Sequence, residues 1–500
     1  MKKSSIFLLI ILLFMGCVAP IQDQMEPDWD ISILPSSIRL DPVTNEIIDN
    51  RFVTLKNTPA KYENILKNNW IFDGKRASLS GARGEYVSFQ FVLTNNSGTY
   101  LKGINIEILP FKNNEFQFNN NPELFLEWSV QVKTPSTGYP IASLGKGWYP
   151  DALIPFEYIQ MDSSKVHRRW TYPLDLPDFH NRIENQRSVI VWVDQYIPFN
   201  QEDAPPGIYS SVITASIGEE VKEIPVDLHV WDFAIPNENK LRASLQHEGF
   251  LSRSDEGEAL MIYQLFKRNR IGLMDPTYKP DLQIAENGYV TLGWDTFDHR
   301  LEKYFTGEAF TSEYGYEYGP GYGTPIETFI LPFNVFGKHG TIGWPDTGTP
   351  ETERQPENVG LYRKVIKQVR DHLSTMYDPE KTEITVYLNG LDESYFPEAW
   401  DRMVYYGDIF KEDYPEAHFR IDGSYSEEAM GVVKNSINSW ASHTINYNID
   451  KVKKYQEMGI EDWLYGPMFY ESKVNSWVGS STFIDLPLVN DRAISWSSWK

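Results

Sequence analysis

Hydrophobic and polar residues alternate with a period of two along most of the first half of the chain. The segments rich in β-branched and aromatic residues are 86–93, 104–109, 125–132, 189–193, 209–217 and 226–231. Turns rich in Asn, Gly and Pro separate them, and no convincing long helical pattern occurs in this half. The pattern predicts a β-sandwich over residues 31–236.

After residue 236 the pattern changes to short apolar segments that alternate with helical periods. The expected strands are 242–246, 271–275, 329–333, 383–389, 418–422, 439–443, 462–468 and 492–496. Such an alternation of eight strands with helices predicts a (β/α)8 TIM-type barrel over residues 241–500. Because Lys500 directly follows the eighth expected strand, we expect the barrel to be truncated there.

One long stretch, residues 277–328, interrupts this alternation after the second expected strand. It is rich in Gly, Pro and Tyr, including Tyr314, Tyr316, Tyr318 and Tyr322. Segments of this length between barrel elements are usually functional or disordered. The density of tyrosine favours an insertion that covers the substrate.

The composition narrows the class of partner. With 500 residues and 41% hydrophobic content, the chain is long enough for two or three domains with separate cores. A net charge of -23 argues against a nucleic acid as partner, since phosphates require Lys and Arg. The 29 Tyr and 15 Trp are numerous, and aromatic rings outside the core suit the C–H faces of sugars.

The N-terminus has the pattern of an export signal. Lys2 and Lys3 precede an apolar run over residues 6–15, which is too short to span a bilayer as a mature helix. The run ends in Leu-Phe-Met-Gly-Cys at Cys17 and resembles a bacterial lipoprotein signal. We expect residues 1–16 to be removed, Cys17 to be lipidated, and residues 17–30 to tether an exported protein to a bacterial membrane. Phe14 and Met15 are bulkier than usual there, so plain secretion is the alternative.

The strongest catalytic indication follows the fourth expected strand of the barrel. That strand alternates apolar and polar residues, Gly390 breaks it, and Asp392 and Glu393 come next. A buried charge needs a partner, and the carboxyl ends of barrel strands are where catalytic groups lie. An arbitrary Asp-Glu pair is more often a solvated loop, but its position here favours catalysis.

Polar or aromatic residues also occur at the ends of the other expected strands. Their positions predict that these residues bind substrate: His247, Asp275, Asn334, Asn389, Asp422, His443, Tyr470, Glu471 and Trp496. His443 or Asp422 alone would be better explained as a structural residue; the recurrence at successive strand ends is what favours one pocket.

The sequence offers no pattern for a metal or a cofactor, and we expect neither. It contains no HExxH motif, no Gly-rich phosphate loop after a strand and no GxSxG elbow. The single cysteine, Cys17, excludes a disulfide within the chain. Two carboxylates among aromatic residues therefore predict glycosidic bond chemistry on an oligosaccharide or glycoconjugate.

The order of these motifs resembles glycoside hydrolase family 123, whose known activity is β-N-acetylgalactosaminidase. The likeness covers residues 72–500 and rests on the segments Ala-Pro-Pro-Gly-Ile-Tyr at 204–209, Val-Asp-Leu-His-Val-Trp-Asp-Phe at 226–233, and Asp392-Glu393. It implies cleavage of β-linked N-acetylhexosamine by substrate-assisted retaining catalysis. Asp392 would then orient the 2-acetamido group of the substrate, and Glu393 would act as general acid and base.

Two other functions remain open at this point. In one, Glu393 is the acid/base and Glu471 a nucleophile, which would extend the activity to glycans without an acetamido group. In the other, the protein is a lipid-anchored glycan-binding protein with an inactive barrel. Turnover of any chromogenic β-glycoside would exclude the latter.

Overall fold

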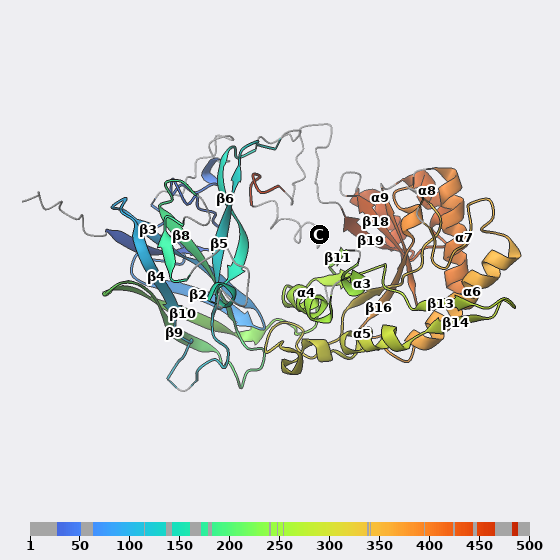
Figure 1. Ribbon diagram of the computed structural model, residues 1–500, viewed down its shortest axis with the longest axis horizontal. Helices are drawn as coiled ribbons and strands as arrows, with labels where there is room; N and C mark the ends of the chain where they lie inside the picture. Colours follow the sequence, from blue (N-terminus) through green and yellow to red (C-terminus); the bar gives the residue numbers. More distant parts are fainter. Residues whose placement is uncertain are drawn as a thin grey trace, which may run out of the picture.

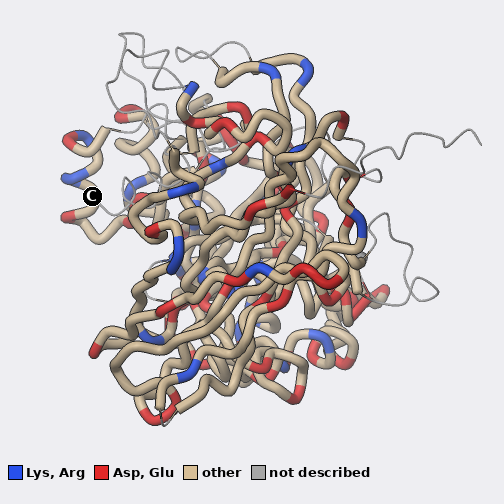
Figure 2. Tube along the Cα trace, turned by 90° about the vertical axis from the view of Figure 1, so that its left-hand side faces the viewer, with Lys and Arg blue, Asp and Glu red and all other residues tan. Residues whose placement is uncertain are grey.

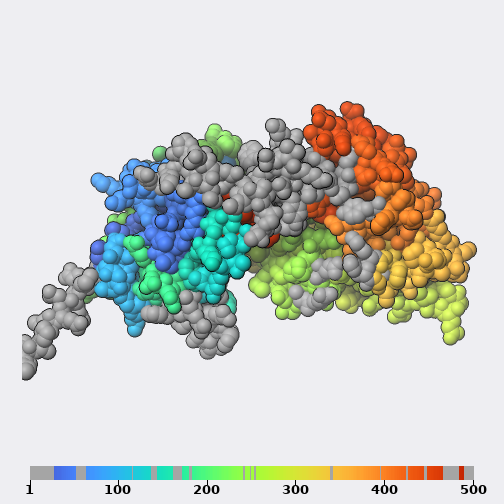
Figure 3. All heavy atoms as spheres, turned by 90° about the horizontal axis from the view of Figure 1, so that it is seen from above, coloured from blue at the N-terminus to red at the C-terminus, as the bar shows by residue number. Residues whose placement is uncertain are grey.

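The structure is a computed structural model. It describes residues 28–51, 64–114, 116–136, 143–160, 172–178, 183–239, 242–247, 249–253, 255–337, 340, 342–394, 396–423, 426–443, 448–465 and 483–488. Two lobes lie side by side, one from each half of the chain (Figure 1, Figure 3).

The N-terminal lobe contains two five-stranded sheets. One has the order β1 (Trp29–Pro35), β3 (Tyr86–Asn95), β8 (Ser188–Tyr196), β5 (Glu123–Val132) and β6 (Gly147–Pro155). The other has the order β2 (Ala77–Arg83), β10 (Glu220–Ala234), β9 (Gly207–Ile217), β4 (Leu101–Ile108) and β7 (Leu174–Leu176). All strand pairs are antiparallel except β2 with β10. A short helix, α2 (Phe156–Gln160), follows β6.

The period of two seen in the sequence is the reason why these sheets share a core. Along β3, Phe89, Phe91 and Leu93 are fully buried in the core cluster that both sheets form. Along β10, Val226 and Leu228 enter the same cluster, while Asp227 between them is more exposed. The apolar face of each sheet is thus removed from water by the other sheet.

The C-terminal lobe is built on parallel strands. Five of them form one sheet in chain order: β15 (Thr328–Ile330), β16 (Glu383–Tyr387), β17 (His418–Gly423), β18 (Ser439–His443) and β19 (Glu461–Tyr465). β11 (Ser244–Gln246) and β12 (Gly272–Met274) form a separate parallel pair. The hairpin β13 (Asp281–Ile284) and β14 (Val290–Gly293) is antiparallel.

The prediction of a (β/α)8 barrel is therefore wrong. Over the described residues the strands make an open, curled five-stranded sheet and a separate two-stranded ladder rather than one closed sheet of eight. The eighth expected strand, 492–496, lies outside the described residues. The physical reason for the error is that apolar patterns locate strands one by one, whereas closure depends on which strands pair.

Helices fill the connections between these strands. They are α3 (Phe250–Arg253), α4 (Glu256–Arg268), α5 (Asp295–Thr306), α6 (Pro356–Leu373), α7 (Pro397–Asp413), α8 (Glu427–Val433) and α9 (Ile449–Gln456), with short 3-10 turns at η1 (Glu308–Phe310), η2 (Ser312–Tyr314) and η4 (Asn389–Leu391). Helices α6, α7 and α8 lie on the side of the sheet away from the N-terminal lobe (Figure 1). Their apolar stripes join the strands in one core, as Val365 and Val369 of α6 illustrate.

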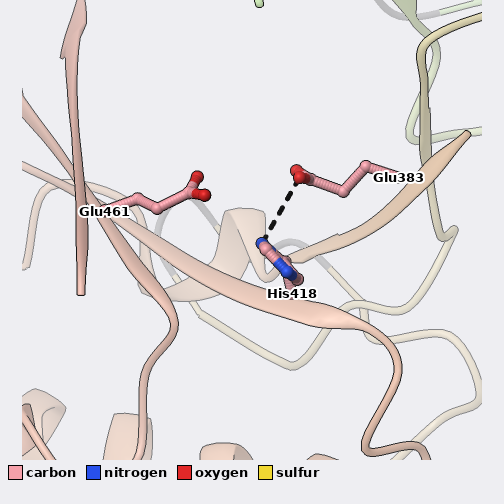
Figure 4. A group of neighbouring side chains, drawn as sticks. All are labelled: Glu383, His418 and Glu461. Atoms are coloured by element: carbon pink, nitrogen blue, oxygen red, sulfur yellow. Dashed lines mark ion pairs between the residues drawn. The ribbon is translucent and has the colours of Figure 1, made fainter. Parts of the chain in front are cut away.

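The curl of the parallel sheet is visible at its amino-terminal edge. β16 and β19 are three strand spacings apart, which would be about 14 Å in a flat sheet. Nevertheless, carboxylate oxygens of Glu383 on β16 and Glu461 on β19 lie within 4.8 Å of one another and of a ring nitrogen of His418 on β17 (Figure 4). The strand ends therefore converge, and side chains from distant strands can meet.

Charged and aromatic side chains join the two lobes. Arg268 of α4 donates hydrogen bonds to Glu123 at 2.8 Å and to Asp194 at 3.2 Å, and its guanidinium lies 4.1 Å from the centre of the Tyr86 ring. The ring of Tyr318 stacks on that of Tyr196 at 6.0 Å. Tyr318 belongs to the 277–328 insertion and packs between the lobes, and the idea that this insertion covers the substrate stays a prediction.

A late segment of the chain, residues 483–488, lies against the N-terminal lobe. Arg39 donates hydrogen bonds to the backbone oxygens of Ile484 at 2.6 Å and Leu486 at 2.7 Å. The backbone N–H of Leu144 donates to the oxygen of Asp485 at 2.7 Å. The C-terminal part of the chain thus returns to the first lobe. The expected domain boundary at 236–241 falls between β10 and β11, and independent folding of the two lobes stays a prediction.

Charge and membrane-spanning potential can be read along the described chain. Lys and Arg are scattered among Asp and Glu along the trace rather than gathered on one stretch (Figure 2). None of the described helices combines the length and the apolar character needed to cross a bilayer.

Candidate active site

Asp392 and Glu393 lie just beyond the carboxyl end of β16. The strand ends at Tyr387, the turn η4 follows, and both acids are half-buried. Glu393 has a φ of 45°, in the left-handed region that residues other than Gly seldom adopt. Its backbone N–H donates to the oxygen of Asp422 at 3.3 Å. Because the backbone leaves the extended conformation here, two adjacent side chains need not point to opposite faces.

A close backbone crossing shapes the turn before the acids. A Cβ atom added to Gly390 would lie 2.1 Å from the backbone oxygen of Val335, and one added to Gly337 would lie 1.9 Å from that of Gly390. Only glycine fits at either position without a shift of the backbone. The Asn334 side chain accepts a hydrogen bond from the Gly390 N–H at 2.8 Å. Asn334 therefore supports the turn that carries the acids.

A tyrosine from the far edge of the sheet contacts Glu393. The Tyr465 hydroxyl, at the end of β19, donates to Oε1 of Glu393 at 2.5 Å. The ring of His443, at the end of β18, meets the Tyr465 ring edge to face at 5.1 Å. The curl of the sheet is what brings β18 and β19 to the acids that follow β16.

A second tyrosine, Tyr387, contacts Asp392, and Arg420 contacts the ring of that tyrosine. The Tyr387 hydroxyl is hydrogen-bonded to Asp392. Arg420 of β17 donates to both carboxylate oxygens of Asp422, at 2.8 and 3.2 Å. The guanidinium carbon of Arg420 also lies 4.8 Å from the centre of the Tyr387 ring.

The electrostatics of this end of the sheet disfavour further negative charge. Burial, together with the smaller effect of the charges of Asp392 and Glu393, raises the pKa of Asp422 to about 6 against the opposing effect of Arg420. Burial, together with Asp422 and Asp392, also raises the pKa of Tyr387 far above its usual range. Tyr387 is therefore a neutral phenol at physiological pH and acts as a hydrogen-bond donor.

A cavity of about 160 Å³ adjoins this acidic group. Its apolar walls include Trp400, Met403 and Trp440, all nearly fully buried, and its polar lining includes Asp422 and Ser394. The Trp440 indole N–H donates a hydrogen bond to the backbone oxygen of Gly423 at 3.1 Å. The cavity can therefore receive a small group that is apolar on one side and polar on the other.

The structure brings together part of the predicted set. Asn334, Asp392, Glu393, Asp422 and His443 lie around one end of the sheet, and Asn389 belongs to the η4 turn itself. Whether these residues bind substrate stays a prediction. Cys17, Tyr470, Glu471 and Trp496 lie outside the described residues.

Two predicted residues have evident local structural contacts. Asp275 is buried and accepts hydrogen bonds from the backbone N–H groups of Gly249 at 3.0 Å and Leu251 at 2.8 Å. It also accepts from the N–H and hydroxyl of Thr277. The ring of His247 stacks on that of Phe250 at 4.1 Å. These contacts explain both residues without a substrate.

Sequence reasoning missed three residues: Tyr387, Arg420 and Tyr465. Arg420 and Asp422 are two apart on a strand, and such residues share a face, so this pair could have been found from the pattern. Tyr465 could not, because its contact with Glu393 depends on the curl of the sheet. Tyr387 lies inside the expected strand 383–389, where the alternation alone gives no reason to single it out.

A second acidic group lies at the amino ends of the same strands. Glu383, His418 and Glu461 have the residue types and spacing that can hold a metal ion (Figure 4). However, the Arg242 guanidinium forms ion pairs with both Glu383 and Glu461, so a cation of the protein already balances one of their two negative charges. The expectation that the protein uses no metal stays a prediction.

Comparison with known proteins defines the class of fold. No protein-family model matches the sequence, and no curated protein matches it. The comparison with solved structures shows that the chain has a glycoside hydrolase-like fold. One matching structure is a family 123 glycoside hydrolase from Clostridium perfringens, studied for the details of glycolipid glycan hydrolysis. It gives a TM-score of 0.54 at 12% identity, covering 94% of this chain and 77% of that one.

At that identity the match shows a shared fold and leaves the family subtype a prediction. A glycosyl hydrolase family 2 member from Bacteroides cellulosilyticus gives a TM-score of 0.27 at 10% identity, covering 83% of this chain and 48% of that one. A family 10 xylanase with a bacterial Ig-like domain from termite gut gives 0.27 at 11% identity, covering 56% and 68%. These two TM-scores are too low to support a conclusion.

Proposed function

We propose that this protein is a glycoside hydrolase that cleaves β-linked N-acetylhexosamine, with N-acetylgalactosamine as the first substrate to test. One observation carries the proposal: two adjacent carboxylates at the carboxyl end of a parallel sheet, each hydrogen-bonded by a tyrosine. Crevices outside the carboxyl ends of parallel strands are where ligands of open α/β sheets bind. The glycoside hydrolase-like fold supports the same class of reaction.

In the proposed mechanism the substrate supplies its own nucleophile. The carbonyl oxygen of the 2-acetamido group attacks the anomeric carbon while Asp392 accepts the amide N–H and stabilises the positive charge that develops there. Glu393 gives its proton to the leaving oxygen as the glycosidic bond breaks. Glu393 then takes a proton from water, which opens the oxazolinium ring and restores the acetamido group with retained configuration.

The two tyrosines support different steps. Because Tyr465 engages Oε1 of Glu393, proton exchange with the substrate falls to Oε2. Tyr387 donates to Asp392 and so restricts the orientations that this carboxylate can adopt. Donors that are fixed before the reaction need not reorganise when charge develops.

The neighbouring cavity agrees with an acetamido substrate. Its tryptophan and methionine walls suit the methyl group of the acetamido substituent, whose N–H is left to Asp392. A plain hydroxyl at the 2-position of a sugar would leave the apolar walls uncovered. We therefore expect β-N-acetylhexosaminides to be preferred over β-hexosides.

A panel of aryl β-glycosides tests the proposal. We expect turnover of the β-N-acetylgalactosaminide or β-N-acetylglucosaminide, little turnover of the galactoside and glucoside, and tight inhibition by a thiazoline that mimics the bicyclic intermediate. Equal turnover of all four, with no thiazoline inhibition and with Glu471→Gln more damaged than Asp392→Asn, would indicate a covalent mechanism instead. Turnover of none would favour a glycan-binding protein.

We also propose that the protein is exported and anchored through Cys17. The proposal is motivated by the basic and apolar N-terminal pattern that ends at this cysteine. Cys17→Ala should then move the protein from the membrane fraction to the soluble fraction. If the variant fractionates as the wild type does, the anchor does not depend on Cys17.

A further inference from the structure

Arg420 forms an ion pair with Asp422, close to Asp392 and Glu393. The proposed reaction steps give Arg420 no role. Its side chain is only 7% exposed and stands on β17 between residues of two other strands. It donates to both carboxylate oxygens of Asp422, at 2.8 and 3.2 Å, and to Oε1 of Gln246 on β11 at 3.0 Å. A guanidinium held by two side chains in this way has a fixed plane.

The Arg420 guanidinium, fixed in this way, also contacts the ring of Tyr387. The guanidinium carbon lies 4.8 Å from the ring centre, and the ring is almost fully buried. The far end of the same ring, its hydroxyl, is hydrogen-bonded to Asp392. A continuous path of contacts therefore runs from Gln246 and Asp422 through Arg420 and Tyr387 to Asp392.

We propose that Arg420 is a positioning residue, which by holding Asp422 and supporting the Tyr387 ring fixes the orientation of Asp392 toward the substrate. The inference rests on the proposed function, because it assumes that Asp392 acts on a substrate. A plain structural ion pair would need only the contact with Asp422. The contact with Tyr387 adds the link to Asp392.

The deciding variant removes the arginine together with its ion-pair partner. Arg420→Met alone would leave Asp422 as a buried, unpaired charge and could prevent folding. The double variant Arg420→Met/Asp422→Asn leaves no such charge, so the fold should be retained. We expect its kcat to fall by about 10²-fold with little change in KM, because a misplaced catalytic group costs about that much. A matched control is Arg363→Met/Asp413→Asn, which removes an ion pair between α6 and α7.

Two further variants separate positioning from charge balance. Arg420→Lys keeps the charge but loses the planar fork, so it should lose most of the kcat that the double variant loses while its pH profile stays close to that of the wild type. Tyr387→Phe removes the hydroxyl that contacts Asp392. Its effect should not add to that of the double variant, because both act through one path. Full activity of Arg420→Lys, or wild-type kcat in the double variant, would overturn the inference.

A spectroscopic readout keeps this test separate from the proposed function. In protein labelled with ¹³C at the aspartate carboxyl, the Asp392 resonance is assigned by its loss in Asp392→Asn. We expect the double variant at 420 and 422 to shift that resonance and its titration, and the control pair at 363 and 413 to leave both unchanged. An unchanged resonance overturns the positioning role. If no aryl glycoside is hydrolysed by the wild type, the proposed function fails while this result still stands.

Discussion

Both ends of the parallel sheet carry acidic residues beside an arginine, but the pKa of Glu461 at one end is lowered and that of Asp422 at the other is raised. At the amino end, Glu383 and Glu461 both form ion pairs with Arg242, and His418 lies beside them. The carboxyl end holds three acids, of which Asp422 is paired with Arg420. Each end therefore combines acids from more than one strand with an arginine, and the number of acidic residues alone does not distinguish them.

The pKa shifts at the two ends have opposite signs. Burial raises the pKa of Glu461, but hydrogen bonds from Arg242 and Trp463 outweigh it and the net pKa is lowered. Burial also raises the pKa of Asp422, and there Arg420 does not outweigh it, so the pKa reaches about 6. Acids that stay incompletely compensated destabilise a fold, and such groups are concentrated at functional sites. The comparison therefore supports the proposal that the chemistry takes place at the carboxyl end.

The largest expected difference between the two ends is in turnover. Asp392→Asn removes the charge that stabilises the oxazolinium ion, and we expect a loss of about 10²–10³-fold in kcat. Glu461→Gln at the amino end should leave kcat within about twofold, since electrostatic effects of this kind require proximity to the reacting atoms. Steady-state kinetics on an aryl β-N-acetylhexosaminide measures both.

Circular dichroism of both variants is the control for folding. A loss of turnover in Glu461→Gln as large as that in Asp392→Asn would place chemistry at both ends and break the comparison. Equal, wild-type activity in both variants would remove Asp392 from the mechanism.

The second expected difference is in the pH dependence of stability. The folded-state pKa of Asp422 is about 6 and its usual value is 3.8, so between these pH values the folded state holds the extra proton. Stability therefore falls as the pH rises through this window, by about 3 kcal/mol for a shift of about two pKa units. Asp422→Asn should abolish this part of the slope.

Thermal unfolding between pH 4 and pH 7 measures this slope. Asp371→Asn, an exposed position on α6, serves as the matched control and should follow the wild-type curve. If the curves of Asp422→Asn and wild type remain parallel over the whole range, Asp422 does not titrate in this window.

The sequence allowed good placement of individual strands in the C-terminal lobe. Seven of the eight expected strands overlap observed ones, from β11 to β19, and β18 coincides with its expected range, Ser439–His443. Local alternation of apolar and polar residues is a property of each segment and needs no knowledge of its neighbours. For the same reason the Asp392–Glu393 pair could be placed at a strand end before the structure was known.

What the sequence could not provide were contacts that depend on the curl and closure of the sheet. Whether β11 pairs with β12 alone or closes a barrel is decided by register and pairing between segments far apart in the chain. The hydrogen bond from Tyr465 to Glu393 joins the edge strand β19 to the segment after β16, which lies three strands away. Asp275 is predicted to bind substrate because it ends a strand; its carboxylate accepts hydrogen bonds from the backbone of the neighbouring loop, a contact that the pattern did not indicate, and substrate binding stays a prediction.

The smallest expected effect is a pH-dependent loss of stability at the amino end of the sheet, where His418 lies beside Glu383 and Glu461. Arg242→Met leaves Glu383 and Glu461 without their shared cation, and for a partly exposed ion pair the loss should be about 1 kcal/mol at neutral pH. Burial lowers the pKa of His418, Glu461 raises it, and Arg242 lowers it. Without Arg242, the pKa of His418 should rise, because two carboxylates then face it without a competing cation.

A histidine whose pKa is raised in the folded state adds stability at low pH and loses it as the pH rises. Protonated His418 should therefore partly replace Arg242, and the destabilisation by Arg242→Met should be smaller at pH 5.5 than at pH 7.5. Arg363→Met is the matched control: its exposure is similar, 33% against 35%, and its ion-pair partners are the carboxylates of Glu412 and Asp413. The control's destabilisation should change less between these pH values, because carboxylates remain ionised throughout. Melting temperatures of the two variants and the wild type at both pH values decide this. Equal pH dependence in the two variants would show that His418 does not take over the role of the arginine, and that the amino end is compensated by Arg242 alone.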